Sequence, residues 1–250
     1  MQPHWVNSGT SSGGFDWLGG ETVNTLPNSP TLVEAPIGEP NFKSIWWLEE
    51  ALTAAKRVMR VKLPGGAASG FMIAADIMIT NHHVFENADD AARAILQFNY
   101  RLTASGSPVH VDEWECDPDS LFEANPSLDY SICRVRHKDG IKAGDEWGYF
   151  DLRHGVNSVV NQRVNIIQHP RGRFKEIAFR DNQIKRIDET IVQYLTDTDY
   201  GSSGSPVLDD WFNVVALHSQ RVADPNQPTK YYRNQGFNIN AILDDTSSIP

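Results

Sequence analysis

Short runs rich in β-branched and aromatic residues recur along the chain from residue 58 onward, and this pattern constrains the fold most strongly. The first series is VMRVKL, SGFMIAA, DIMITNHHV, RAILQFNY, VHVDEW and DYSICRVR. The second series is RVNIIQH, KEIAFRDNQIKRI, TIVQYLTD, PVLDD, FNVVALHSQ and GFNINAIL. Turn-forming stretches such as Pro64-Gly65-Gly66 separate the runs. Many short strands at this spacing are typical of a sandwich or a barrel.

The two series predict two domains in tandem. We expect an all-β fold of two six-stranded antiparallel β-barrels, the first over residues 58–140 and the second over residues 157–250 together with a C-terminal segment. The loop-like, glycine-containing stretch 141–156 lies between them and is typical of a linker. A chain of 250 residues is long enough to bury both cores.

The N-terminal region, residues 1–43, has a different composition. It is rich in Gly, Ser, Pro and Asn and shows no apolar period. We expect it to be a flexible tail. The alternative is a regulatory arm that covers the active site or binds a partner protein.

A short helix is predicted next, over residues 44–57. Ser44 is a candidate N-cap, because its hydroxyl can accept a hydrogen bond from the first turn. Apolar residues follow at helical spacing: Ile45, Leu48, Leu52 and Ala55. We expect Trp46 and Trp47 to help pack the helix against the strands.

Composition excludes several classes of function. The net charge of −10 would repel phosphate backbones, so nucleic acid is not an expected partner. No apolar stretch reaches the roughly 18 residues of a membrane-spanning helix, and no membrane partner is expected. The N-terminus lacks the basic and apolar regions of a secretory signal, which favours a cytoplasmic location.

The sequence gives no sign of a metal or cofactor. The histidines outside the motifs discussed below show no metal-ligand spacing: His110, His137, His154 and His169. There is no Walker-type loop or dinucleotide fingerprint. Cys133 alternates with strand-like residues and is typical of a small buried side chain, so we expect no disulfide with Cys116.

The string GSSGSPV, residues 201–207, has the composition that a nucleophilic serine requires. Such a serine sits on a tight turn whose backbone N–H groups point at the developing oxyanion. Gly201 can adopt the conformation that this turn demands, and Gly204 removes a side chain near the nucleophile. We predict that Ser203 attacks and that the N–H groups of Gly201 and Ser203 form the oxyanion hole. The alternative is a polar loop.

A nucleophilic serine needs a base and an acid that orients the base. In TNHHVF, either His82 or His83 could take the proton, because histidine titrates near neutrality. Asp129 begins the run DYSICRVR, whose apolar alternation suggests burial. The other acids of this region lie in more polar, turn-like surroundings: Asp112, Asp117, Asp119 and Asp139.

These three motifs together resemble the chymotrypsin-like serine proteases. TNHHVF is similar to the histidine signature of their bacterial branch, which includes the glutamyl endopeptidases, and there the base is the residue that here is His83. LDYSICRV resembles the Asp-led strand, and GSSGSPV resembles the serine motif. The order of His83, Asp129 and Ser203 is the family's order. The resemblance covers residues 57–243 and implies that these three residues form the catalytic triad.

Two departures separate the chain from the animal digestive branch. Val84 follows the histidine where that branch has a disulfide cysteine. Ser202 stands where that branch has the aspartate that pairs with a newly cut N-terminus. Activation by such a cut is therefore not expected.

The resemblance also implies a specificity pocket. Thr198 and His218 stand at the offsets from Ser203 where glutamyl endopeptidases carry a Thr and a His that contact the acidic side chain of the substrate. A buried carboxylate needs donors, and a hydroxyl and an imidazole supply them. Ser219 is expected near Asp129. Ser219, Gln220 and Arg221 are expected to present the backbone edge to which an extended substrate adds as a strand, and Gly236 to shape the back of the pocket. The alternative is that His218 is a core histidine with its own partner, or that the pocket takes a different polar residue.

The expected function is that of a serine endopeptidase that cleaves protein or peptide substrates after acidic residues, Glu above all, without a cofactor. A cytosolic effector protease under the control of a partner that acts on the N-terminal region fits the same features. The alternative is a latent protease or a catalytically inactive peptide-binding module of the same fold.

Overall fold

The computed structural model describes residues 42–153, 155–246 and 249. The tail predicted over residues 1–43 lies outside the described residues except for its last two. The chain divides into two compact units, Met1–Phe42 and Lys43–Pro250, and all the helices and strands below belong to the second.

One helix precedes the strands, as predicted. It is α1, Trp46–Lys56. Trp47 is 5% exposed and packs against Phe212, with ring centroids 5.1 Å apart. Trp46 stacks on Trp211, also at 5.1 Å. The two tryptophans therefore fix the helix to the loop after β12, as expected of large aromatic side chains.

The apolar face predicted for this helix is wrong. Three of its residues are mostly exposed: Ile45 at 73%, Leu48 at 54% and Leu52 at 68%. Burial of Trp47 turns the helix so that Ala54, two turns on, also faces the body. The predicted N-cap is wrong as well, because the helix begins after Ile45 and no side chain caps it.

The first sheet has seven antiparallel strands in the order β5-β4-β1-β2-β3-β7-β6. They are β1 (Val58–Leu63), β2 (Gly66–Ala74), β3 (Ile77–Thr80), β4 (Ile95–Phe98), β5 (Asp112–Glu115), β6 (Phe122–Asn125) and β7 (Tyr130–Arg134). A short helix, α2 (Ala88–Ala92), connects β3 to β4. Because β3 pairs with β7 in the register Thr80↔Ser131, the segment after β3 lies beside the segment before β7.

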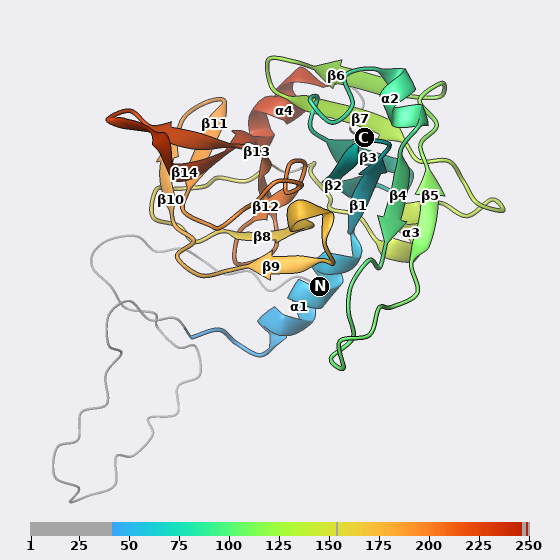
Figure 1. The fold of residues 1–250 in the computed structure, drawn as a ribbon, viewed down its shortest axis with the longest axis horizontal. Helices are drawn as coiled ribbons and strands as arrows, with labels where there is room; N and C mark the ends of the chain where they lie inside the picture. The colour runs from blue at the N-terminus through green and yellow to red at the C-terminus, as the bar shows by residue number, and fades with distance from the viewer. Residues whose placement is uncertain (1–41, 154, 247–248, 250) are drawn as a thin grey trace, which may run out of the picture. The chain divides into compact units, whose positions relative to one another are not determined.

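The second sheet also has seven antiparallel strands, in the order β10-β11-β14-β13-β12-β8-β9. They are β8 (Asn165–Gln168), β9 (Glu176–Ala178), β10 (Ile184–Ile187), β11 (Ile191–Tyr194), β12 (Pro206–Leu208), β13 (Val214–Asp224) and β14 (Gln227–Asn238). A 3₁₀ turn, η1 (Pro170–Gly172), follows β8, and a last helix, α4 (Ile239–Asp245), follows β14. Figure 1 shows the first sheet in blue to green and the second in yellow to red.

The prediction of an all-β fold with two antiparallel sheets is confirmed, but each sheet has seven strands and not six. The strand missed in the first sheet is β6, a short edge strand with the half-polar sequence FEAN. In the second sheet the run KEIAFRDNQIKRI is two strands, β9 and β10, because Asp181 adopts a positive φ of 45° between them.

Two other element boundaries differ from the sequence pattern. β14 begins at Gln227, well before the run GFNINAIL, and its outer half pairs with the end of β13. The end of that run is α4, which Asn238 caps by accepting a hydrogen bond from the Asn240 N–H at 3.1 Å. The stretch expected to be a linker, 141–156, contains a short helix, α3 (Ala143–Trp147).

One hydrophobic cluster joins the two sheets. It includes Phe71 and Ile79 from the first sheet and Leu208 and Leu217 from the second, all fully buried. Burial of this apolar surface is the main favourable term for docking one sheet against the other. The segments that carry the candidate site residues lie at this junction.

The packing of α1 gives a testable contrast. Trp47→Ala should lower the free energy of unfolding by about 3 kcal/mol, because it removes a buried indole from the contact with Phe212. Leu52→Ala, on the exposed face, should change it by less than about 0.5 kcal/mol. Urea unfolding followed by circular dichroism measures both. A larger loss for Leu52→Ala than for Trp47→Ala would contradict the orientation of the helix.

Candidate active site

Ser203 lies on a tight turn between β11 and β12. The Ser202 N–H donates to the Asp199 carbonyl at 3.0 Å, and the Ser205 N–H donates to the Ser202 carbonyl at 3.0 Å. The hydroxyl of Ser202 accepts a hydrogen bond from the Asp199 N–H at 3.1 Å. Ser202 is buried, and the partner of its hydroxyl is Asp199 of the same turn. In the animal digestive branch, the aspartate at this position pairs with a newly cut N-terminus instead.

Two glycines of this turn adopt positive φ angles, +85° at Gly201 and +83° at Gly204. The positions also allow no side chain. A Cβ on Gly201 would lie 2.8 Å from the His169 carbonyl oxygen, and one on Gly204 would overlap the Ser69 carbonyl oxygen. Glycine is therefore required at both places for conformation and for space.

The first sheet holds the turn through Ser69 of β2. The Ser69 N–H donates to the Ser203 carbonyl at 2.9 Å. The Ser69 hydroxyl donates to the Gly201 carbonyl at 2.9 Å and accepts from the His169 N–H at 3.0 Å. Ser69, which is fully buried, thus connects β2 to the serine turn and to the segment that contains His169.

The oxyanion hole is predicted to use the backbone N–H groups of Gly201 and Ser203. The Tyr200 carbonyl accepts a hydrogen bond from the Arg171 N–H in η1. In a trans peptide the N–H points opposite to the carbonyl, so the Gly201 N–H is directed away from Arg171. Within the described residues, neither the Gly201 N–H nor the Ser203 N–H makes a hydrogen bond. Both donors are therefore available to an oxyanion.

His83 and Asp129 are brought together by the pairing of β3 with β7. The Nδ1 atom of His83 lies 2.9 Å from Oδ2 and 3.0 Å from Oδ1 of Asp129. The backbone N–H of His83 also donates to Oδ1 of Asp129, at 3.1 Å. Asn81 donates through Nδ2 to the Asp129 carbonyl at 2.9 Å, which ties the two segments together. The neighbouring His82 has no hydrogen bond to Asp129.

Asp129 is held in its charged form. Burial alone raises the pKa of this carboxyl, but the hydrogen bonds from His83 and Ser219 outweigh it, so the pKa lies below its usual value. The Ser219 hydroxyl donates to Oδ2 at 2.6 Å. Asp129 itself adopts a positive φ of 44°, an uncommon conformation that aspartate tolerates better than most residues. A charged Asp129 can orient the His83 imidazole and stabilise its protonated form.

The hydroxyl of Ser203 points toward β13 in this structure. Its Oγ donates to the Ser219 carbonyl at 3.3 Å, and no hydrogen bond joins it to His83. A rotation of the Ser203 side chain about χ1 would move its hydroxyl from this staggered position to another. Hydrogen bonds between nucleophile and base are often long or absent before substrate binds.

Thr198 and His218 lie on the two segments that flank the serine turn. The backbone of His218 pairs with the turn, since the Gly204 N–H donates to its carbonyl at 3.0 Å. The imidazole is buried, and its Nδ1 lies 2.6 Å from the Tyr194 hydroxyl. The Thr198 hydroxyl donates to Oδ1 of Asn234 at 2.8 Å.

The other predicted substrate residues lie along β13 and β14. Ser219 is buried and bonded to Asp129, while the side chain of Gln220 is exposed. Gly236 pairs with His218 across the two strands, where a Cβ would lie 2.6 Å from the Leu217 carbonyl oxygen. Gly236 therefore allows the close approach of β14 to β13 behind His218.

Sequence reasoning missed several residues that the site uses. Ser69 and Tyr194 are buried hydroxyl groups in apolar strands, and a polar residue in such a strand is the signal that marks them. Arg171 contributes through its backbone, and no side-chain pattern indicates that. Asn234 belongs to the part of β14 that the strand pattern did not include.

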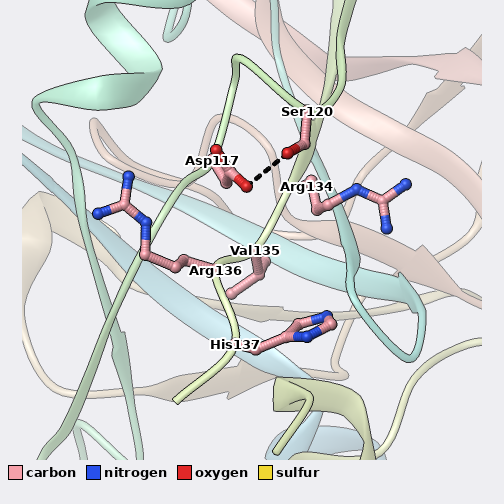
Figure 2. A pocket seen from close by; sticks show the side chains of 6 residues that line it. All are labelled: Asp117, Ser120, Arg134, Val135, Arg136 and His137. Atoms are coloured by element: carbon pink, nitrogen blue, oxygen red, sulfur yellow. Dashed lines mark hydrogen bonds between the residues drawn. The ribbon is translucent and has the colours of Figure 1, made fainter. Parts of the chain in front are cut away.

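One described cavity of about 550 Å³ lies away from these residues (Figure 2). It lies between the C-terminal end of β7 and the segment that joins β5 to β6. The residues that line it are Asp117, Ser120, Arg134, Val135, Arg136 and His137. Figure 2 shows the two arginines pointing in opposite directions, and both are paired, Arg134 with Asp76 and Arg136 with Glu115. Asp129 precedes the other end of β7, so this cavity is separate from the candidate active site.

The described residues contain no group of three or more His, Cys, Asp or Glu side chains that could hold a metal ion. Cys116 and Cys133 are buried free thiols. The contact with Cys133, together with burial, raises the pKa of the Cys116 thiol well above its usual value, which makes it unreactive. No helix among the described residues is long and apolar enough to cross a membrane.

Comparison with known families decides the classification. The model of the trypsin-like peptidase domain matches residues 68–217, which contain His83, Asp129 and Ser203. The chain belongs to the trypsin-like peptidase family. The three predicted triad positions and the serine turn therefore lie inside the residues that match that domain.

Two sequence relatives are longer proteins. The uncharacterized protein y4fB of Sinorhizobium fredii (strain NBRC 101917 / NGR234) is 33% identical over 210 residues, which cover 76% of this chain and 32% of that protein. Secreted RxLR effector protein 73 of Plasmopara viticola is 29% identical over 189 residues, which cover 67% of this chain and 46% of that protein. The peptidase chain thus spans about a third of the first relative and just under half of the second.

Solved structures agree on the fold. A Glu endopeptidase superposes with a TM-score of 0.57 at 16% identity, over 76% of this chain and 88% of that one. The MamO protease domain from Magnetospirillum magneticum gives a TM-score of 0.59 at 13% identity, over 78% and 98%. The protease Deg5 gives 0.57 at 14% identity, over 79% and 90%. The fold is that of the chymotrypsin-like serine proteases.

The space around Gly204 gives a prediction for the turn. Gly204→Ala should lower the free energy of unfolding by about 3 kcal/mol or more, because the new methyl group meets the Ser69 carbonyl in addition to the strain of a positive φ. Gly106 has a similar φ of +80° with nothing within 4 Å, so Gly106→Ala should cost only about 1–2 kcal/mol. Thermal unfolding compares the two variants, and equal losses would refute the close approach.

Proposed function

We propose that this peptidase-family protein is a serine endopeptidase that hydrolyses peptide bonds after acidic residues, Glu above all. The observation that carries the proposal is the charged Asp129 bonded to His83 beside a serine turn with two open N–H donors. Binding surfaces without catalysis have no need for that combination of an oriented base and free oxyanion donors.

The chemistry is acyl transfer. His83 takes the proton of Ser203, whose Oγ then attacks the scissile carbonyl carbon. The N–H groups of Gly201 and Ser203 stabilise the oxyanion of the tetrahedral intermediate. His83 gives the proton to the leaving amine, and water then repeats the two steps on the acyl-enzyme with His83 as base and acid in turn. Asp129 keeps His83 in the tautomer with the proton on Nδ1.

The preference for an acidic residue rests on the positions of Thr198 and His218 next to the serine turn. His218 follows the apolar run 214–217 of β13, and Thr198 lies in the loop that leads into the serine turn. A few placed polar groups of this kind fix the orientation and the type of a ligand in a pocket. An extended substrate would add as a strand beside Ser219, Gln220 and Arg221, with main-chain hydrogen bonds.

A latent protease or a catalytically inactive peptide-binding module is the second candidate. The observation in its favour is the Ser203 hydroxyl, which donates to the Ser219 carbonyl and not to His83. A partner that acts on the N-terminal region would then be the agent that turns the hydroxyl toward His83.

A peptide library varied at the residue before the scissile bond tests the proposal. The unmodified protein should cleave after Glu, and Ser203→Ala should abolish both this cleavage and covalent labelling by a serine-directed phosphonate. Mass spectrometry of the products identifies the cleaved bond. Cleavage that persists in Ser203→Ala would remove Ser203 as the nucleophile, and Ser203-dependent cleavage after another residue would remove the acidic preference.

The two adjacent histidines provide an internal control for the base. His83→Ala should reduce kcat by several orders of magnitude, whereas His82→Ala should leave it within a few-fold, because only His83 contacts Asp129. Asp129→Asn should reduce kcat about 10⁴-fold by favouring the wrong tautomer of His83. Steady-state kinetics on the best library peptide gives the three values. If His82→Ala is the inactive variant, the assignment of the base is wrong.

A further inference from the structure

The pocket residues Thr198 and His218 bring no positive charge to an acidic substrate. Burial, aided by the nearby charge of His83, lowers the pKa of His218 to about 3, so its imidazole is neutral at pH 7. Both side chains also have protein partners already, Thr198 with Asn234 and His218 with Tyr194. A carboxylate that leaves water needs a counter-charge as well as donors.

Arg221 is the cation best placed to supply that charge. It lies two residues beyond Ser219 on β13, or about 7 Å along the strand. Its backbone pairs directly with Asn234, the residue that holds the hydroxyl of Thr198. Arg221 therefore lies at the same place as the predicted pocket residues, on the strand that the substrate would join.

Two tyrosines position the guanidinium of Arg221. Its Cζ lies 4.9 Å from the ring centroid of Tyr200 and 4.4 Å from that of Tyr231. Tyr200 immediately precedes Gly201 of the oxyanion hole, while Tyr231 lies on β14. The arginine thus links the hairpin of β13 and β14 to the residue that precedes the serine turn. Aromatic faces attract a guanidinium and hold it in place without neutralising its charge.

The charge of Arg221 is not compensated by the described part of the chain. No ion pair or side-chain hydrogen bond of its guanidinium occurs among the described residues. Arg171, near the same turn, is instead paired with Asp199 at 2.6 Å, and Arg233 on β14 donates to Gln193 at 3.3 Å. An arginine with open donors in a planar fork is suited to bind a carboxylate through two parallel hydrogen bonds.

The net charge of the protein opposes the approach of an acidic substrate only at long range. At −10 the chain repels acidic substrates at long range. At physiological salt this repulsion is screened beyond about 8 Å, so a cation in direct contact with the substrate decides the balance. Tyr200 and Tyr231, the two rings that hold Arg221, are exposed, so a substrate can reach this side chain from the solvent.

We propose that Arg221, held between Tyr200 and Tyr231, is a specificity-determining residue that pairs with the acidic side chain of the substrate residue before the scissile bond. The proposal rests on the acidic preference given under the proposed function and assigns its charge to a residue other than Thr198 and His218.

The test measures binding separately from catalysis. Two fluorescent peptides that differ only by Glu or Gln before the scissile bond are titrated against the Ser203→Ala protein, which cannot cleave them, and anisotropy gives the two Kd values. Glu and Gln have the same shape, so the ratio of the Kd values reports the charge alone. The same titrations are repeated with Arg221→Ala and Arg221→Lys in the Ser203→Ala protein.

Arg233→Ala is the matched control. Arg233 lies on β14 of the same hairpin, and its guanidinium also lies over a tyrosine, with Cζ 4.9 Å from the ring centroid of Tyr232. It differs from Arg221 in its hydrogen bond to Gln193. Loss of a positive charge from the hairpin in general would affect both variants, whereas a direct contact would affect Arg221 alone.

The Glu peptide should bind about 100-fold more tightly than the Gln peptide, and Arg221→Ala should reduce this ratio to near one. Arg221→Lys should keep part of the ratio, because a lysine retains the charge but not the planar fork. Arg233→Ala should leave the ratio unchanged. A ratio that survives Arg221→Ala, or a Ser203→Ala protein that does not distinguish Glu from Gln, would overturn the proposal.

Cleavage assays with Ser203 intact separate this proposal from the proposed function. If the protein cleaves nothing but the ratio falls in Arg221→Ala, the charge assignment stands and the enzymatic function fails. If the protein cleaves after Glu but the ratio survives Arg221→Ala, the enzymatic function stands and Arg221 is not the determinant.

Discussion

The candidate active site depends on the backbone contact between Ser69 and the serine turn. Ser203 comes from the second sheet, whereas His83 and Asp129 come from the first. Their separation is therefore set by how closely the two sheets approach, and the Ser69 N–H bonded to the Ser203 carbonyl fixes that distance. Gly204 permits the approach, because any Cβ at that position would meet β2.

Two further hydrogen bonds fix the backbone of the serine turn in the absence of a substrate. Ser69 holds the Gly201 carbonyl from one side, and the Arg171 N–H holds the Tyr200 carbonyl from another. The carbonyls of two successive peptide groups are thereby fixed, and the Gly201 N–H is directed away from Arg171, because it lies opposite the Tyr200 carbonyl in a trans peptide. Donors fixed before the reaction need no reorganisation when the oxyanion develops. The exposed pair of Tyr200 and Arg221 lies at the outer end of this ordered turn.

The sequence predicted best those features that depend on local pattern. The all-β class followed from short runs of β-branched residues, and the serine turn followed from the spacing of Gly201 and Gly204. The orientation of α1 was not predictable, because the spacing of Ile45, Leu48 and Leu52 carries no information on the partner that Trp47 meets in Phe212. Ser69, Tyr194 and Asn234 were missed for a related reason, since each acts through a contact with a residue far away in the sequence.

Ser202 has a consequence for how such a protein can be controlled. The buried hydroxyl of Ser202 accepts a hydrogen bond from the Asp199 N–H, so the turn around Ser203 is held by a bond between its own residues. In the animal digestive branch, an aspartate at this position completes the turn only when it pairs with a newly cut N-terminus. Here the neutral hydroxyl of Ser202 stands in that place and is bonded to Asp199, three residues earlier in the chain. The turn around Ser203 therefore forms together with the rest of the fold. The serine turn thus needs no charged chain end to complete its hydrogen bonds.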